Sequence, residues 1–318
     1  MMTETIGKRR WKGYLLGMAA GVSYGMNPLF TLPLYEDGMN ADSVLFFRYL
    51  FGIVILGLML VVRRPEGEPI RRRQWLPLMV YGVLMALSSL TLFLSYNYMA
   101  AGIASTILFV YPVVVALVMT FFFHEKLTLR TMVCILTAIV GVLLLYKQSD
   151  GATLSLAGVL LSLTSAVTYA LYLIGINRHG LKQIPTLKVT FFVLLFGWAI
   201  FLIRALYQGG LVLPTAEHWY LWGCLIALGV VPTAVSFLCT TAAIQHVGST
   251  PTAILGVLEP ATAVFFGVTV FGERLTVREW VGLMFIMVAV VLVVAGGKIT
   301  QPLTRFRHLF PKGRKADK

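Results

Sequence analysis

The chain has 318 residues, of which 58% are hydrophobic and only 12% are charged, and its mean hydropathy is +0.84. This composition excludes a soluble domain of such length and indicates that lipid surrounds most of the chain. A net charge of +13 would suggest a nucleic-acid partner for a soluble protein. Here, however, the basic residues cluster between apolar segments, so we expect no nucleic-acid partner.

Ten apolar windows have the length of about 18 to 23 residues that is needed to cross the hydrocarbon layer as a helix. The first window is too long, and too weakly flanked by a cleavage signal, to be a removed signal peptide. We therefore predict an all-α membrane protein with ten transmembrane helices. Their predicted positions are 13–34, 42–62, 75–96, 103–122, 129–146, 155–177, 186–207, 219–239, 250–271 and 277–296.

The basic residues between these windows predict the orientation of the chain. If the N-terminus is cytoplasmic, 21 of the 26 lysines and arginines lie on the cytoplasmic side. Ten crossings then place the C-terminus in the cytoplasm as well. The segment 298–318 adds seven of these charges beside aromatic and leucine residues, so we expect a basic cytoplasmic tail that contacts anionic membrane lipid.

The sequence contains an internal repeat. Pro112 and Pro260 are each followed thirteen residues later by Glu-(Lys/Arg)-Leu-Thr, and the two copies are 148 residues apart. Upstream, glycines at positions 13, 17, 21 and 25 match small residues at positions 158, 162, 166 and 170, at an offset of 145. We predict two five-helix units at 1–146 and 147–297. Because five is an odd number of crossings, the second unit is inverted, as in many secondary transporters.

These residues carry a family resemblance. The paired small-residue helices, the Tyr111-Pro112 and Glu259-Pro260 pairs and the element after each pair resemble the drug/metabolite transporter superfamily, specifically its EamA-type ten-helix members. The resemblance covers nearly all of residues 13–297. It implies a bacterial inner-membrane location, export or exchange of small metabolites that are often amino acids, and a cavity enclosed by helices 1, 3, 4, 6, 8 and 9.

Pro112 and Pro260 lie near the middle of their spans and cannot donate a helical backbone hydrogen bond. In hydrocarbon, the carbonyl groups that they free must be buried in protein or face water, which favours kinks at a repeat interface. A simple packing kink is the alternative. We expect the small residues Gly21, Gly25 and Ala166 to permit close helix contact and sliding at the gates.

Glu259 is the only acidic residue that the predicted spans place at membrane depth. A charge at the centre of a spanning helix costs roughly 2.5 to 3.5 kcal/mol on insertion scales, so such residues usually face an interior and have a function. One hypothesis is that Glu259 couples transport to protons or binds an amine. The other is that its carboxyl group holds the ninth helix to a neighbour by hydrogen bonds.

Further candidate site residues are polar or aromatic groups inside the spans. Arg48 either binds a substrate carboxylate, anchors the interface by reaching outwards or contacts a helix end. Tyr24 and Asn27 match Tyr169 and Tyr172 at the offset of 145, and either line a pocket or pack between helices. Tyr111 occupies the position that Glu259 holds in the second copy. Residues Tyr96, Asn97 and Tyr98, in contrast, have the pattern of an outer aromatic belt.

The three cysteines lie inside predicted spans without metal-ligand spacing, and none of the five histidines belongs to a His-Glu-x-x-His helix. No Walker-type loop is present, so we expect no metal, cofactor or ATP hydrolysis in this chain. The favoured function is a secondary carrier for a small-molecule substrate, driven by gradients such as protons or by exchange. The alternative is a membrane-embedded lipid-modifying enzyme or scramblase. The sequence specifies neither substrate identity nor oligomeric state.

Overall fold

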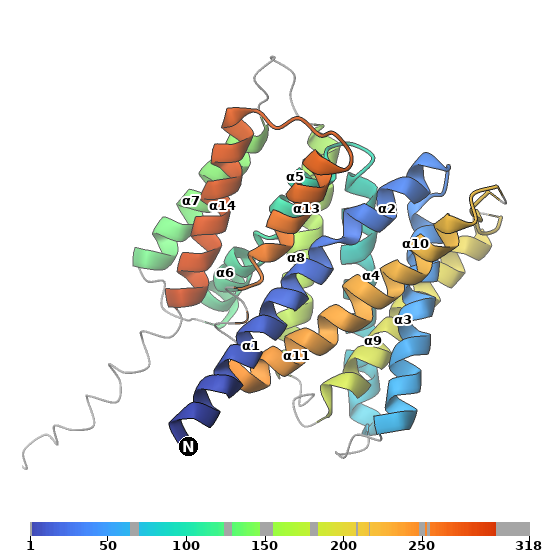
Figure 1. Cartoon of the computed structure of the whole chain (residues 1–318), viewed down its shortest axis with the longest axis horizontal. Coiled ribbons are helices and arrows are strands. Elements are labelled where there is room, and N and C mark those ends of the chain that lie inside the picture. Colours follow the sequence, from blue (N-terminus) through green and yellow to red (C-terminus); the bar gives the residue numbers. More distant parts are fainter. Residues whose placement is uncertain are drawn as a thin grey trace, which may run out of the picture.

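The computed structural model describes residues 2–63, 70–123, 129–146, 155–178, 184–207, 209–215, 217–247, 252 and 255–296. In this part of the chain every regular element is helical, and the helices form one bundle (Figure 1). The first Glu-Lys-Leu-Thr copy at 125–128 and the basic tail at 298–318 lie outside the described residues. The helices are α1 (Met2–Gly25), α2 (Asn27–Glu36), α3 (Ala41–Arg63), α4 (Arg72–Ser95), α5 (Ala101–Leu108), α6 (Tyr111–Phe123), α7 (Leu129–Tyr146), α8 (Leu156–Arg178), α9 (Thr186–Tyr207), α10 (Tyr220–Gly229), the π-helix η2 (Val230–Val235), α11 (Ser236–Val247), α13 (Leu258–Thr269) and α14 (Val277–Gly296).

Six helical runs of the described chain are long and apolar enough to cross a membrane. They are Ala41–Arg63, Arg72–Ser95, Ala101–Phe122, Leu156–Gly175, Thr186–Tyr207 and Tyr220–Thr240, and shorter apolar helices accompany them at Ile135–Leu144 and Leu258–Thr269. The protein is therefore a multi-pass, all-helical membrane protein. The full count of ten spans stays a prediction.

Prolines mark the places where predicted spans are interrupted. Pro28 follows the break between α1 and α2, Pro112 follows the break between α5 and α6, and Pro260 follows the turn before α13. Pro232 lies inside η2. These breaks follow from the missing N–H group and the fixed backbone of proline. We expected the Gly256 carbonyl to lose its usual partner, and it accepts instead from the Glu259 backbone N–H at 3.0 Å.

The packing of the helices is symmetric when the two halves of the chain are exchanged. Three pairs join the equivalent predicted spans of the two halves, namely α3 with α9, α5 of the fourth span with α13 of the ninth, and α7 with α14. The remaining large contacts come in matched pairs: α4 packs on α8 as α11 packs on α1, and α4 packs on α9 as α10 packs on α3. Figure 1 shows α7 beside α14 at one side of the bundle and α3 beside α9 towards the other.

Individual hydrogen bonds repeat this symmetry. The Ser88 hydroxyl donates to the Ser165 carbonyl at 3.1 Å, and the Ser236 hydroxyl donates to the Ala20 carbonyl at 3.1 Å. Ser236 lies 148 residues after Ser88, and Ser165 lies 145 residues after Ala20. These are the two offsets that the sequence repeat shows, so corresponding residues make corresponding contacts in the two halves.

Glycine contacts extend the symmetry to the central helices. A Cβ atom on Gly82 of α4 would lie 3.0 Å from the Val193 carbonyl oxygen and 3.2 Å from the Gly197 nitrogen. A Cβ atom on Gly229 of α10 would lie 3.1 Å from the Arg48 carbonyl oxygen and 3.2 Å from the nitrogen of residue 52. Both glycines thus allow two helix backbones to approach closely, α4 to α9 in one case and α10 to α3 in the other. In this comparison Arg48 occupies the position that Val193 holds in the other half.

Candidate functional site

Arg48 lies inside the helical bundle. Only 3% of its surface is exposed, although one expectation from the sequence was a side chain that reaches the outer interface. The close approach of α3 to α10 at Gly229 buries this part of α3. The Arg48 Nε donates to the Thr233 hydroxyl oxygen at 3.2 Å. Its guanidinium carbon lies 5.2 Å from the centre of the Phe93 ring and 5.9 Å from the centre of the Tyr24 ring, within range for cation–π attraction.

Glu259 lies in the first turn of α13, directly before Pro260. The opposite charges of Glu259 and Arg48 lie within electrostatic range of one another, and Tyr24 lies within range of both. In the described part of the chain, the Glu259 carboxylate accepts no hydrogen bond from a neighbouring helix. The structure therefore brings an acid from the second half and a base from the first half to one region of the bundle.

Four tyrosines surround the Glu259 carboxylate or extend away from it. The Tyr111 and Tyr169 ring centres are 4.8 Å apart and edge to face, and Tyr169 stacks on Tyr172 at 5.9 Å. The Glu259 charge acts on Tyr24, Tyr111 and Tyr169, but no such interaction is found for Tyr172. The predicted tyrosines thus come together in one aromatic cluster, with Tyr172 at its far end from Glu259.

Asn27 is 2% exposed and lies at the break between α1 and α2. Its amide nitrogen donates to the Tyr24 carbonyl at 2.8 Å. Its amide oxygen is buried without a hydrogen-bond partner, and so is the Thr31 hydroxyl one turn further along α2. Buried polar atoms normally have partners, so these two orphaned groups are candidates for contacts with a bound molecule or water.

Four side chains of this site lie deep in the bundle and still have some accessible surface. Tyr24, Tyr111, Tyr169 and Glu259 lie deep among the packed helices. All four nevertheless retain accessible surface and are only partly buried by area. The four side chains thus lie deep in the bundle and keep some surface for contact with a bound molecule.

The predicted gate residues lie at close helix contacts. A Cβ atom on Gly21 would lie 2.9 Å from the Leu255 carbonyl oxygen, and one on Gly25 would collide with the Glu259 carbonyl oxygen and approach Thr262 Cβ to 2.6 Å. The α1 backbone therefore rests directly on the chain that carries Glu259. Ala166 of α8 is fully buried. Pro112 is partly buried at the start of α6, and Pro260 is buried at the start of α13.

Sequence reasoning missed three neighbours of Arg48 and the tyrosines. Tyr96 was expected in an outer belt, but it is 7% exposed and its hydroxyl lies 3.4 Å from the Ser105 hydroxyl, because the chain turns inwards between α4 and α5. Phe93 and Thr233 were not singled out, since a phenylalanine and a threonine in apolar helices carry no signal of their own. Pro232 next to Thr233 was the one available indication of an irregular helix.

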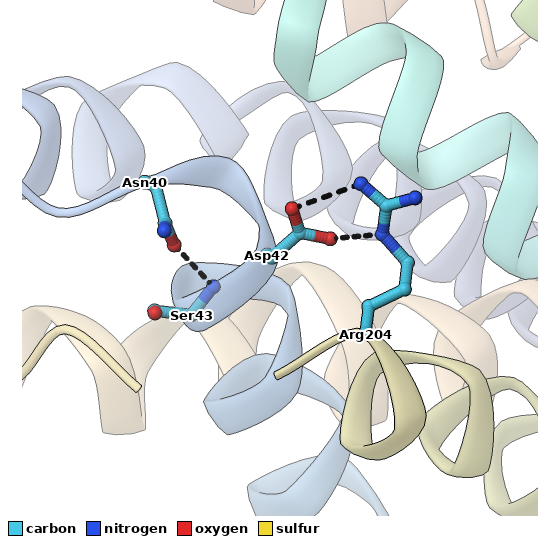
Figure 2. Close-up of polar contacts among 4 residues, drawn as sticks. All are labelled: Asn40, Asp42, Ser43 and Arg204. Atoms are coloured by element: carbon cyan, nitrogen blue, oxygen red, sulfur yellow. Dashed lines mark hydrogen bonds and ion pairs between the residues drawn. The ribbon is translucent and has the colours of Figure 1, made fainter. Parts of the chain in front are cut away.

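A polar cluster at the ends of α3 and α9 ties the two halves at one end of the bundle. Asp42 at the start of α3 accepts from Arg204 of α9 at 2.5 and 3.1 Å, and the Asn40 side chain accepts from the Ser43 backbone at 2.8 Å (Figure 2). The Ser43 hydroxyl in turn accepts from the Val212 N–H at 2.9 Å. These contacts fix the segment after α2 against the segment after α9.

Asp37 adds a second tie between the same two segments. Its carboxylate accepts from the Thr215 backbone N–H at 2.8 Å and lies 2.8 Å from the His218 Nδ1. The Thr215 N–H, followed by His218, lowers the pKa of Asp37 below its ordinary value. Within the described residues, no group of three or more His, Cys, Asp or Glu side chains could hold a metal ion.

The helix packing thus places charged and aromatic side chains from both halves of the chain in the interior of a multi-pass helical bundle. The EamA-like transporter family model matches the chain twice, over residues 11–147 and 156–295. The protein therefore belongs to the EamA-like transporter family, within the drug/metabolite transporter superfamily, as the sequence motifs predicted. The double match also confirms that the architecture contains two repeats.

Individual relatives agree with this assignment. An uncharacterized transporter of Archaeoglobus fulgidus is 27% identical, with 82% of this chain and 90% of the relative aligned. The threonine/homoserine exporter RhtA of Escherichia coli is 26% identical, with 79% of this chain and 81% of the relative aligned. One solved crystal structure superposes with a TM-score of 0.63 over 91% of this chain and 98% of its own, at 16% identity, which shows a shared fold.

Proposed function

We propose that this transporter is a secondary carrier that exports or exchanges small metabolites, namely amino acids or related amphipathic compounds, across the bacterial inner membrane. The observation that carries the proposal is the pair Arg48 and Glu259. These opposite charges come from the two halves of the chain and lie within electrostatic range of one another in the interior of the bundle. A zwitterion brings a complementary charge for each group.

The surroundings of each charge suit one end of an amino acid. Glu259 and the rings of Tyr24, Tyr111 and Tyr169 offer a carboxylate and aromatic faces, which attract an ammonium group. Arg48 offers planar N–H donors that suit a carboxylate. The Asn27 amide oxygen, which has no partner, supplies one more acceptor. That a relative is named as a threonine and homoserine exporter supports the same substrate class.

The proposed mechanism is alternating access between two inverted five-helix halves, with ten spans and both termini in the cytoplasm. The exchange symmetry of the helix contacts supports it, because two equivalent halves can adopt each other's conformation and so open the site to either side. Gly21, Gly25 and Ala166 are the proposed sliding contacts, and Pro112 and Pro260 the proposed kinks. Glu259 is also the candidate proton carrier, and no cofactor or enzymatic step is needed.

Counterflow in proteoliposomes tests this function. Vesicles with purified protein are loaded with unlabelled L-threonine, L-leucine or L-phenylalanine, and entry of the same labelled amino acid is followed. We expect saturable entry that requires loading and is absent from protein-free vesicles. The variant Glu259→Gln should lose most of this exchange, while the control Glu36→Gln, at the exposed end of α2, should keep it. Wild-type vesicles that exchange none of the three amino acids would contradict the proposed substrate class.

A further inference from the structure

Two departures from the twofold pattern lie together at Arg48. The equivalent position in the second half is Val193, which is 1% exposed and packs as an ordinary apolar residue. Helix packing at this position therefore does not require a cation. Placing an arginine there is expensive unless the charge has a use, because a charged group within a membrane bundle must be paired or solvated.

The second departure is the π-helix η2, which contacts α3 directly. Five residues separate Gly82 from Ser88 in α4, and six separate Gly229 from Ser236 in the equivalent helix. Gly82 and Gly229 make matching contacts, as do Ser88 and Ser236, so the second half contains one additional residue between these anchors. The six residues between the second pair are η2 itself, Val230–Val235. Short π-helical turns of this kind are frequent at functional sites.

Thr233 links this insertion to Arg48 through a hydroxyl of defined direction. Pro232 has no N–H group, so the carbonyl four residues before it, that of Leu228, lacks its α-helical partner. The Thr233 hydroxyl donates to this Leu228 carbonyl at 3.2 Å. Since a carbonyl only accepts and an arginine only donates, the hydroxyl must accept from the Arg48 Nε at 3.2 Å. The Thr233 side chain thus donates to the carbonyl that Pro232 leaves without a partner and accepts from the Arg48 guanidinium.

This arrangement leaves the terminal nitrogens of the guanidinium without a carboxylate partner among the described residues. An arginine has five N–H donors, and Thr233 occupies the one on Nε. The Tyr24 hydroxyl also interacts with the guanidinium, and the ring of Phe93 lies against it. In the part of the chain that the structure describes, Arg48 forms no ion pair with a carboxylate within salt-bridge distance. The terminal nitrogens present the planar pair of donors that matches a carboxylate.

We propose that Thr233, presented by the one-residue π-helical insertion, is a specificity-determining positioning residue that orients Arg48 to select substrates with a carboxylate group. This inference rests on the proposed function, since it needs a substrate that enters the interior of the bundle. It explains why the insertion, Pro232 and Thr233 occur in only one half. A substrate with one carboxylate needs one oriented arginine, so the two halves differ at Arg48 and Thr233 while their helix packing stays symmetric.

The test compares amino acids with their decarboxylated amines in the counterflow assay. The pairs are L-threonine with 1-aminopropan-2-ol, L-leucine with 3-methylbutan-1-amine, and L-phenylalanine with 2-phenylethylamine. In Thr233→Val the KM for the amino acids should rise about tenfold, as expected for a lost hydrogen bond to a charged group, with little change in maximal rate. The KM for the amines should not change, and Thr233→Ser should restore wild-type selectivity.

Two controls separate positioning from general damage. Ser236 begins α11 directly after η2, and its buried hydroxyl donates to the Ala20 carbonyl and not to Arg48. Ser236→Ala should therefore leave the ratio of amino-acid to amine KM unchanged. If Thr233→Val does not fold, Thr233→Ala provides the same comparison. Equal KM values in wild type and Thr233→Val, or an equal rise for acids and amines, would overturn the inference alone. A wild-type protein that exchanges no amino acid would overturn the proposed substrate class and this inference with it.

Discussion

The carboxylate of Glu273 accepts a hydrogen bond from the backbone nitrogen of Ala101 at 3.0 Å, across 172 residues of sequence. The Gly102 N–H also points to this carboxylate and favours its charged form, so Glu273 caps the first turn of α5 from the opposite half of the chain. Burial raises the pKa of Glu273, and the two backbone donors oppose that rise. The glutamate of the second Glu-Arg-Leu-Thr copy thus joins α5 to the end of α13, which explains its place in the motif.

Removal of this cap should destabilise the protein. We expect Glu273→Ala to lower the free energy of unfolding by about 1 kcal/mol, the usual effect of a lost helix cap, and Glu273→Gln to lower it less because the amide oxygen still accepts. Thermal unfolding in detergent measures both. Glu36→Gln changes an exposed acid as a control and should have no effect. Equal stability of Glu273→Ala and wild type would show that the cap contributes nothing.

The Asp37 tie predicts an acid-dependent loss of stability. Because contacts in the folded protein lower the Asp37 pKa, its contribution is complete above the ordinary value of 3.8 and disappears as the pH falls through the lower folded value. Asp37→Asn should therefore flatten the decline of the melting temperature below about pH 4. Melting curves from pH 3 to pH 7 provide the comparison. A decline as steep in the variant as in wild type would exclude Asp37 as its source.

The contact between α1 and α13 predicts opposite outcomes for two glycine substitutions. Gly25→Ala should cost about 1 to 3 kcal/mol of stability and reduce exchange, because its Cβ would meet the backbone carbonyl of Glu259. Gly223→Ala in α10 meets nothing within 4 Å and should be neutral or slightly stabilising. Unfolding and counterflow are measured for both variants. Full activity and stability of Gly25→Ala would mean that α1 does not rest on α13 in this way.

The Asp42–Arg204 pair predicts a measurable coupling between the two halves. Its geometry is bidentate, but 40% of the Arg204 side chain is exposed, so solvent screening limits its contribution. We expect a double-mutant cycle of Asp42→Asn and Arg204→Gln to give a coupling free energy of about 1 kcal/mol, reduced at high salt. Additive effects of the two substitutions would show that the ion pair does not stabilise the contact between α3 and α9.

The regular helices were well predicted because hydrophobic length is written directly in the sequence. The windows 129–146, 186–207 and 277–296 coincide with α7, α9 and α14. The interrupted spans were predicted as continuous helices, since the sequence shows where proline stands but not whether a neighbouring group accommodates the break. The turn at Gly256–Val257, for example, depends on a backbone hydrogen bond to Glu259. The π-helix contains one residue more than the equivalent stretch of α4, and the repeat spacing alone did not show where that residue lies.

The predicted site residues were chosen by residue type and by matched position, and both criteria have limits. They selected Tyr24, Tyr111 and Tyr169 together with Glu259, which the structure brings to one region of the bundle interior. They could not place Arg48, because an arginine six residues into a span has the reach to face either water or protein. Its orientation follows from the approach of α3 to Gly229, a contact between distant segments that no local pattern encodes.

The central claim is that the interior site around Glu259 opens to each side of the membrane in turn. It is tested most directly by labelling Tyr24→Cys, in a background without the native cysteines, with a membrane-impermeant maleimide applied to inside-out or right-side-out vesicles. We predict labelling from both sides, slowed from both sides by a substrate amino acid. Labelling from one side only, or no labelling under any condition, would contradict alternating access at this site.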